Sequence, residues 1–375
     1  MRMRTFGLLL IVILGFTSPA LADDVVDGQL GPGALYRLVR PTNWNGSLLL
    51  YSHGYVTGNG PVSLPSEADL FVALLAPRGF AIAFSSYSEN GWAVKDGAQR
   101  THQLLGIFAS RFGAPSRVYM GGASMGGLIA IELIERYPER FAGALAACAV
   151  SGGSRAQFDY LGNTRALFDL FYPGVLPGNA GSVPDGLDLA TQIALPAAAA
   201  IQANPVGALT LASITQTPIP FSNGAQLVES VVTAVTGHAA TASDLVTKMP
   251  RGEYFDNSAV HYTSPVLPAP TLAGINALVG RYEASPAALN YLEQNYQPSG
   301  ALQMPMLMLS TSLDPVVPGF HRAIYRDVVT AAGNSDLLVQ RTVNRYGHCV
   351  FTPTEIAAAF LDLVAWVELG IKPTP

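Results

Sequence analysis

The sequence predicts an α/β protein whose mostly parallel sheet carries helices on both faces, with a largely helical cap inserted into the chain. Short apolar runs typical of strands alternate with helical patterns over residues 23–151, and the alternation resumes over residues 304–375. Between them, residues 152–303 are rich in Ala, Pro and Gly and show only short helical patches. This segment is far too long for a simple connection, so we interpret it as a cap on the core.

The predicted core elements follow one another in strict alternation. Strands are predicted at residues 47–51, 80–84, 118–121, 142–149, 306–310 and 337–343. Helices are predicted at residues 66–76, 98–112, 128–137 and 354–369, with helical patches at 164–171 and 224–236 in the insertion. Short apolar strands separated by helices indicate a parallel sheet that is covered on both faces.

The N-terminus has the pattern of a secretory signal peptide over residues 1–22. Arg2 and Arg4 precede an apolar run over residues 6–16, and the segment ends in an Ala-Leu-Ala sequence at 20–22. The apolar run is too short for a comfortable membrane span, and no later stretch has eighteen unbroken apolar residues. We therefore expect a secreted or periplasmic protein with no stable membrane anchor.

The charge of the chain argues against a nucleic-acid partner. The formal net charge is −5, and the sequence contains no cluster of Lys and Arg that could neutralise phosphates. No group of His, Asp and Glu has the spacing of metal ligands, and no glycine-rich phosphate-binding pattern follows a first strand. We therefore expect neither a metal nor another cofactor.

The most informative motif is a glycine-rich turn that contains Ser124. It lies between the predicted strand at 118–121 and the predicted helix at 128–137, where a nucleophile elbow belongs. Gly122 and Gly126 bracket the serine because a turn this sharp leaves no room for side chains there. The alternative is a plain glycine turn without chemistry.

A serine hydroxyl needs a neighbouring base and a third group that orients that base. Asp314 follows the strand that resumes the core, and His348 lies between the last strand and the terminal helix, so both fall at the sheet edge that carries Ser124. Asp327 and Asp336 are weaker candidates for the acid, and His321 is a weaker candidate for the base. The remaining histidines are interpreted as non-catalytic: His53, His102, His238 and His261.

Four motifs in this order resemble the α/β-hydrolase superfamily. They are His53-Gly54, Gly122-Ala123-Ser124-Met125-Gly126-Gly127, Asp314-Pro315-Val316-Val317-Pro318 and Gly347-His348. The resemblance covers roughly residues 30–150 and 304–371. It implies acyl transfer to water through an acyl-enzyme, with the backbone N–H groups of Tyr55 and Met125 as the oxyanion hole. The sequence has no His-Gly-Gly-Gly run of the kind that many lipases contain, which leaves the subfamily open.

The two cysteines of the chain, Cys148 and Cys349, map to the same edge of the predicted sheet. In an exported protein this favours a disulfide, which would anchor the loop that carries His348. The alternative is a pair of buried free thiols.

These observations favour a secreted carboxylic ester hydrolase with Ser124 as nucleophile, His348 as base and Asp314 as orienting acid. A serine peptidase of the same fold is the alternative, in which Asp159, Asp169 or Glu229 would hold a substrate amine. A non-catalytic binding protein on a hydrolase scaffold is the alternative from another class. Aromatic residues in the insertion suggest that the ester or short peptide substrate has an apolar or aromatic acyl group. These residues are Phe158, Tyr160, Phe168, Phe171 and Tyr172.

Overall fold

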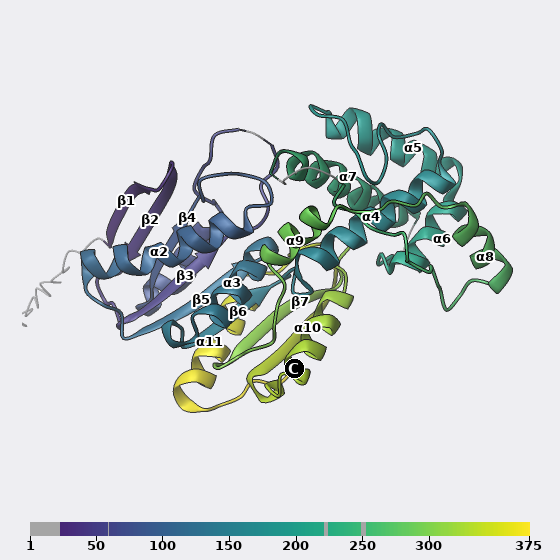
Figure 1. The fold of residues 1–375 in the computed structure, drawn as a ribbon. Helices are drawn as coiled ribbons and strands as arrows, with labels where there is room; N and C mark the ends of the chain where they lie inside the picture. Colours follow the sequence, from purple (N-terminus) through teal and green to yellow (C-terminus); the bar gives the residue numbers. More distant parts are fainter. Residues whose placement is uncertain (1–22, 59, 221–223, 249–252) are drawn as a thin grey trace, which may run out of the picture.

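A computed structural model describes residues 23–58, 60–220, 224–248 and 253–375. The predicted signal peptide at residues 1–22 lies outside the described residues. The structure confirms the α/β class, because one sheet with the strand order β1-β2-β4-β3-β5-β6-β7-β8 runs through the described residues. The pairings from β4 through β3 and on to β8 are parallel, and β1 and β2 add an antiparallel edge (Figure 1).

The strands lie close to their predicted positions where a prediction was made. Their bounds are β1 (Asp24–Leu30), β2 (Ala34–Arg40), β3 (Ser47–Ser52), β4 (Ala81–Ser85), β5 (Arg117–Ala123), β6 (Gly143–Ala147), β7 (Met306–Leu313) and β8 (Leu338–Tyr346). Successive residues of β3 show why the sheet is buried on both faces. Leu48 and Leu50 pack into one apolar cluster, and Leu49 and Tyr51 pack into another.

Helices of the core cover the two faces of the sheet. The first cluster receives α2 (Val94–Phe112), α3 (Met125–Arg136) and α10 (Phe320–Ala331), and the second receives α1 (Ala68–Leu75) and α11 (Pro353–Leu369). Helix α11 begins with a capping box, in which the Thr352 hydroxyl accepts from the Glu355 N–H and the Glu355 carboxylate accepts from the Thr352 N–H.

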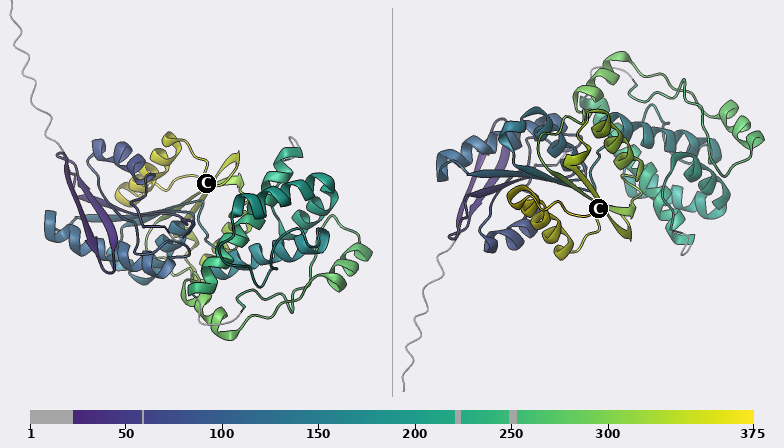
Figure 2. Two further views of the ribbon diagram at one scale, coloured as in Figure 1. Left: turned by 90° about the horizontal axis from the view of Figure 1, so that it is seen from above. Right: turned by 90° about the horizontal axis from the view of Figure 1, so that it is seen from below.

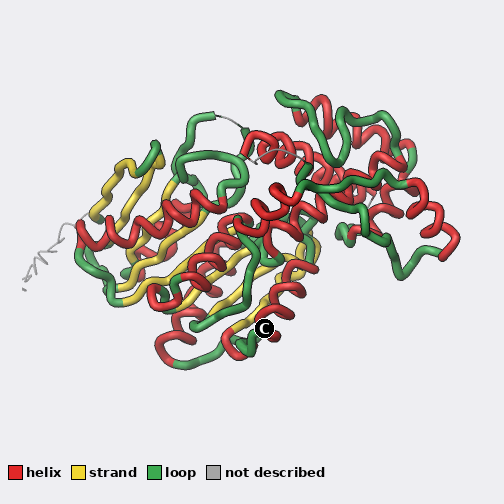
Figure 3. Tube along the Cα trace, in the orientation of Figure 1, coloured by secondary structure: helices red, strands yellow, loops and turns green. Residues whose placement is uncertain are grey.

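The chain between β6 and β7 forms the largely helical cap that the sequence predicted. Its helices are α4 (Gly153–Phe171), η3 (Leu189–Ala194), α5 (Leu195–Ala203), α6 (Pro205–Thr215), α7 (Gly224–Lys248), α8 (Ala269–Leu278) and α9 (Pro286–Gln294). Figures 2 and 3 show most of these helices and their long loops gathered at one side of the sheet. Helices α4 and α7 are longer than the predicted patches, because packing between helices extends them beyond what local sequence patterns indicate.

The hairpin of β1 and β2 was not predicted from the sequence. Its turn contains Gly31 and Gly33, which both have positive φ, at 55° and 110°. Strand β1 carries no buried residue and pairs with β2 partly through exposed ion pairs, including Arg37 with Asp27 at 2.8 Å. Strand β1 therefore gives no hydrophobic signal in the sequence, whereas β2, with Ala34, Tyr36 and Leu38 buried, does carry an alternating pattern from which a strand could have been predicted.

Within the described part of the chain, no single helix is long and apolar enough to cross a membrane. One pair of cap segments, 189–203 and 205–215, reaches that length and composition only together, with a bend of 109° between them.

Helix α3 buries a carboxyl group directly behind the glycine-rich turn. Glu132 is 3% exposed, one of its oxygens lies 3.0 Å from Arg136, and its Oε2 has no hydrogen-bond partner among the described residues. Burial raises the pKa of Glu132 from 4.5 to about 7, and Arg136 offsets only part of this effect. The folded chain therefore binds a proton at Glu132 more tightly than the unfolded chain does.

We expect Glu132→Gln to stabilise the fold at alkaline pH. Because the folded pKa is raised, the stability contributed by Glu132 is fully present below pH 4.5 and is lost as pH rises through 7. Gln keeps the shape and has no charge to desolvate. The free energy of unfolding of the variant, relative to that of the wild type, should therefore rise by about 1–2 kcal/mol between pH 5 and pH 8.5. Thermal unfolding of both proteins at the two pH values measures this, and an identical difference at both would contradict it.

Candidate active site

Ser124 lies on a strained turn between β5 and α3. Its backbone has φ 56° and ψ −122°, a conformation that costs about 1–3 kcal/mol for a residue with a side chain. A Cβ atom at Gly122 would overlap the Gly126 carbonyl oxygen, and one at Gly126 would overlap the Ser52 carbonyl oxygen. Only glycine permits this close approach, and the half-buried Ser124 side chain is held above the carboxyl end of the sheet.

The structure brings Ser124, His348 and Asp314 into one chain of hydrogen bonds. His348 Nδ1 lies 2.7 Å from Asp314 Oδ2, and His348 Nε2 lies 2.8 Å from Ser124 Oγ. A carboxylate only accepts, so in the neutral imidazole Nδ1 carries the proton and Nε2 accepts from the serine hydroxyl. This is the arrangement in which a histidine can remove the proton of a serine.

Asp314 is fixed by its own loop. It is 2% exposed, and its Oδ1 accepts hydrogen bonds from the backbone N–H groups of Val316 and Val317, both at 2.9 Å. Oδ2 therefore remains for His348. Acceptance from the N–H two residues further on is the Asx-turn that an aspartate in a turn commonly forms.

The weaker candidates lie away from this chain of hydrogen bonds. Asp327 and Asp336 are exposed on α10 and on η4 (Ser335–Leu337). His321 is fully buried, accepts a hydrogen bond at Nδ1 from the Gly152 N–H at 3.1 Å, and has its pKa lowered by burial to about 3. His238 is also fully buried in the cap and has its pKa lowered, chiefly by burial, to about 3. These two histidines stay neutral and serve packing.

The two expected oxyanion donors come from separate segments beside Ser124. Met125 is the first residue of α3, where a backbone N–H has no partner within the helix. Tyr55 follows Gly54 in the loop after β3, and a Cβ at Gly54 would lie only 3.2 Å from the Ser124 Cβ. The loop therefore passes close to the serine.

His53 holds the peptide that carries the Tyr55 N–H. Its Nδ1 lies 2.7 Å from the Gly54 carbonyl oxygen, its ring stacks on Tyr87 at 3.8 Å, and the Tyr87 hydroxyl donates to the His53 carbonyl at 3.0 Å. Burial lowers the pKa of His53, so the neutral ring donates from Nδ1. Because the Gly54 carbonyl and the Tyr55 N–H belong to one peptide plane, this bond fixes the direction of the N–H.

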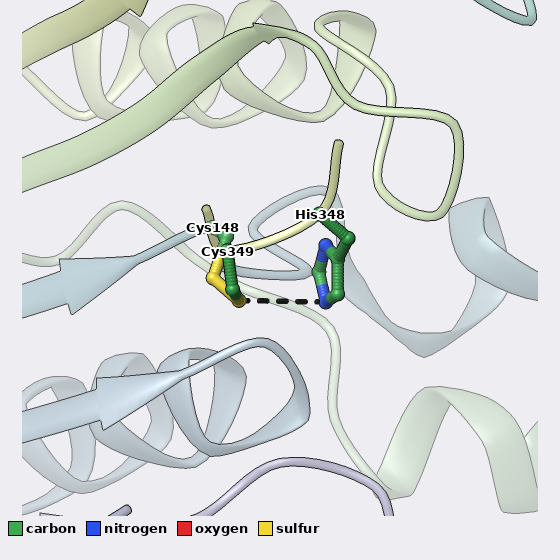
Figure 4. Close-up of side chains that lie close together, drawn as sticks. All are labelled: Cys148, His348 and Cys349. Atoms are coloured by element: carbon green, nitrogen blue, oxygen red, sulfur yellow. Dashed lines mark hydrogen bonds between the residues drawn. A yellow bond between two sulfur atoms is a disulfide. The ribbon is translucent and has the colours of Figure 1, made fainter. Parts of the chain in front are cut away.

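Cys148 and Cys349 form a disulfide at the same edge of the sheet (Figure 4). Cys148 directly follows β6, and Cys349 directly follows His348, so 201 positions of sequence are bridged beside the histidine. This is the predicted pairing, in place of two free thiols. Cys148, Cys349 and His348 lie within 4.8 Å of one another, but sulfurs in a disulfide are not the thiolates that bind metals.

Two cavities meet at Ser124. The larger, about 430 Å³, is lined by His348, the disulfide, Glu67 and apolar residues of α1 and α11. The smaller, about 270 Å³, lies under the cap and is lined by apolar residues and threonines of α4 and α7, together with core residues such as Trp92, Val316 and Val317. Tyr55, Ser124 and Val316 line both cavities. His348 borders only the larger one.

No known family model and no curated protein matches the sequence. Solved structures match its fold. Feruloyl esterase B from Aspergillus oryzae matches with a TM-score of 0.51 at 14% identity, over 93% of this chain and 80% of that chain. A thermostable carboxyl esterase from Bacillus coagulans matches with a TM-score of 0.48 at 12% identity, over 92% of this chain and 99% of that chain. Proline iminopeptidase from Mycobacterium smegmatis matches with a TM-score of 0.47 at 13% identity, over 92% and 99% of the two chains. At such identities the likeness concerns the fold alone.

We expect Gly126→Ala to destabilise the protein by at least about 2 kcal/mol. The new methyl group would overlap the backbone carbonyl oxygens of Ser52 and His53, and the backbone could shift only at a cost in free energy. Gly106→Ala on α2 is the matched control, since a Cβ there meets nothing within 4 Å and Ala favours the helix by up to about 1 kcal/mol. Denaturant unfolding of both variants measures the difference. Equal stability of the two would contradict the close-approach argument.

We expect the double variant Cys148→Ala/Cys349→Ala to lose both stability and reactivity at Ser124. Loss of the cross-link should lower the free energy of unfolding by about 2–5 kcal/mol, and release of the histidine loop should slow labelling of Ser124 by about 10- to 100-fold. Thermal unfolding and the rate of reaction with a fluorophosphonate measure the two effects separately. A variant that unfolds earlier but labels at the wild-type rate would show that the disulfide does not position His348.

Proposed function

We propose that this chain, which belongs by fold to the α/β-hydrolase superfamily, is a secreted carboxylic ester hydrolase that works through an acyl-enzyme on Ser124. The observation that carries the proposal is the chain of hydrogen bonds from Asp314 through His348 to the Ser124 hydroxyl. The disulfide supports export, because such bonds persist in oxidising compartments.

In the proposed mechanism, Ser124 Oγ attacks the ester carbonyl while His348 Nε2 takes its proton. Asp314 keeps the imidazole in the required tautomer and stabilises the imidazolium that forms. The Tyr55 and Met125 N–H groups bind the tetrahedral oxygen, each contributing about 3 kcal/mol to lowering the barrier. His348 then gives the proton to the leaving alcohol. In the second half of the reaction, His348 takes a proton from the water that attacks the acyl-enzyme and returns it to Ser124 Oγ as the acid leaves.

The position of His348 supports an assignment of the two cavities to the two halves of the ester. The leaving oxygen must receive its proton from His348 Nε2, so the alcohol occupies the larger cavity, which His348 borders. The acyl group then occupies the smaller cavity under the cap. Its apolar lining supports the preference for an apolar or aromatic acyl group.

A peptidase that used the cap carboxylates to hold an amine is less well supported. Asp159 is paired with Arg155 at 3.0 Å, and Asp169 is paired with Arg165 at 2.8 Å. Glu229 is exposed on α7, and none of the three lines a cavity at Ser124. The carboxylate that does line the larger cavity is Glu67, on the core. Hydrolysis of an ester compared with its matching amide separates the two activities.

We expect a fluorophosphonate to add once to the wild-type protein and not to Ser124→Ala. Asp314→Asn should lower kcat for a short-chain ester by about 10,000-fold, because the imidazole then favours the wrong tautomer. Asp327→Asn, an exposed aspartate on α10, is the matched control and should retain wild-type kcat. Intact mass and ester hydrolysis measure these effects. A folded wild-type protein that forms no adduct and hydrolyses no ester would leave the binding-protein alternative.

A further inference from the structure

One residue that lines the small cavity under the cap has an acceptor oxygen without a partner. Gln157 lies on α4, is 4% exposed and lines this cavity next to Ser124. Its Nε2 donates to the Val316 carbonyl at 3.0 Å. Its Oε1 is buried and meets no hydrogen-bond partner among the described residues.

The orientation of the Gln157 amide follows from its neighbour. A carbonyl oxygen only accepts, so the amide nitrogen must face Val316 and the amide oxygen must be the free end. A buried acceptor without a partner costs about 1–3 kcal/mol. A bound ligand or an ordered water molecule can supply the missing hydrogen bond.

A second residue that lines this cavity also has a buried polar atom without a partner. Thr236 Oγ1 on α7 is buried and has no partner among the described residues, and Thr236 lines the same cavity as Gln157. The rest of the wall is largely apolar, with Trp92, Leu161 and Val317 among its residues. Thr57, Thr233 and Thr241 also line this cavity, so two unmet polar atoms among mostly apolar neighbours indicate a ligand that is largely apolar and carries a polar group.

The lining decides which polar group fits. No charged residue lines the small cavity, so an ammonium group would lose its hydration without gaining a counter-charge. A carboxylate would face the Gln157 oxygen, which repels it. A hydroxyl can donate to the Gln157 oxygen and can accept from the Thr236 hydroxyl, so it suits either atom.

We propose that the cavity under the cap is built for an acyl group that carries a hydroxyl within its apolar part, recognised by Gln157 and Thr236. This inference rests on the proposed ester hydrolase function and on the assignment of the acyl group to this cavity. It makes Gln157 and Thr236 residues that determine specificity. A site built for a hydroxyl discriminates against the analogue that lacks it, because the buried polar atoms then remain unpaired.

The test compares methyl esters of 3-phenylpropanoic acid that carry hydrogen, a hydroxyl or a methoxy group at the meta or para position of the ring. In the wild type, we expect kcat/KM to be at least tenfold higher for one hydroxylated ester than for the unsubstituted one. The methoxy ester should gain nothing, because it cannot donate to Gln157. Methyl 6-hydroxyhexanoate against methyl hexanoate repeats the comparison for an aliphatic acyl group.

Variants attribute this preference to the two residues. Gln157→Met should lower the hydroxyl-to-hydrogen ratio of kcat/KM by about 5- to 10-fold, and Thr236→Val should lower it by a smaller factor. Gln157→Met also removes the bond to Val316, but that loss affects both esters alike and cancels in the ratio. Gln202→Met, an exposed glutamine on α5, is the matched control and should keep the wild-type ratio.

The outcomes separate this inference from the proposed function. The inference is wrong if the esters with and without the hydroxyl are hydrolysed at equal rates, or if Gln157→Met keeps the wild-type hydroxyl-to-hydrogen ratio of kcat/KM. The proposed function would stand in both cases. If Ser124 does not react with a fluorophosphonate and no ester is hydrolysed, the function and the inference both fail.

Discussion

The close approach of the glycine-rich turn to the end of β3 is the constraint on which the rest of the site depends. Gly126 packs against the Ser52 carbonyl, so the nucleophile and the loop that carries Tyr55 are held by one contact. The strain at Ser124 is tolerated because β5 is paired on both sides, with β3 and with β6. A serine in a relaxed turn would not be held between two other loops in this way.

The cap is bonded to three segments that surround the site. The Tyr55 hydroxyl donates to the Ala240 carbonyl on α7 at 3.2 Å, and the Tyr160 hydroxyl on α4 donates to the Pro315 carbonyl beside Asp314 at 2.8 Å. The hydroxyls of Ser230 and Tyr346 meet at 3.0 Å close to the histidine loop. The insertion therefore contributes to the position of the reacting groups as well as to the wall of a cavity.

How much the sequence predicts depends on how local each signal is. The elbow is read from consecutive glycines, and the core strands are read from apolar runs, so both are found close to where they lie. Asp314 and His348 need only the chain order of a parallel sheet. Gln157 could not be found this way, because its free oxygen is defined by a contact with Val316, 159 positions away. Strand β1 was not predicted because it has no buried residue and therefore no hydrophobic pattern.

The two cavities divide the proposed chemistry between the core and the cap. In the proposed mechanism, the alcohol departs and the attacking water arrives on the side of the larger cavity, because His348 borders only that one, while the acyl group stays under the cap. The groups proposed to transfer protons come from core loops, and half of the residues that line the smaller cavity come from α4 and α7. Selection of the acyl group can therefore change through substitutions on the cap helices while the hydrogen bonds among Asp314, His348 and Ser124 stay intact. The limit to this freedom lies at Val316, which lines both cavities and whose N–H also holds Asp314.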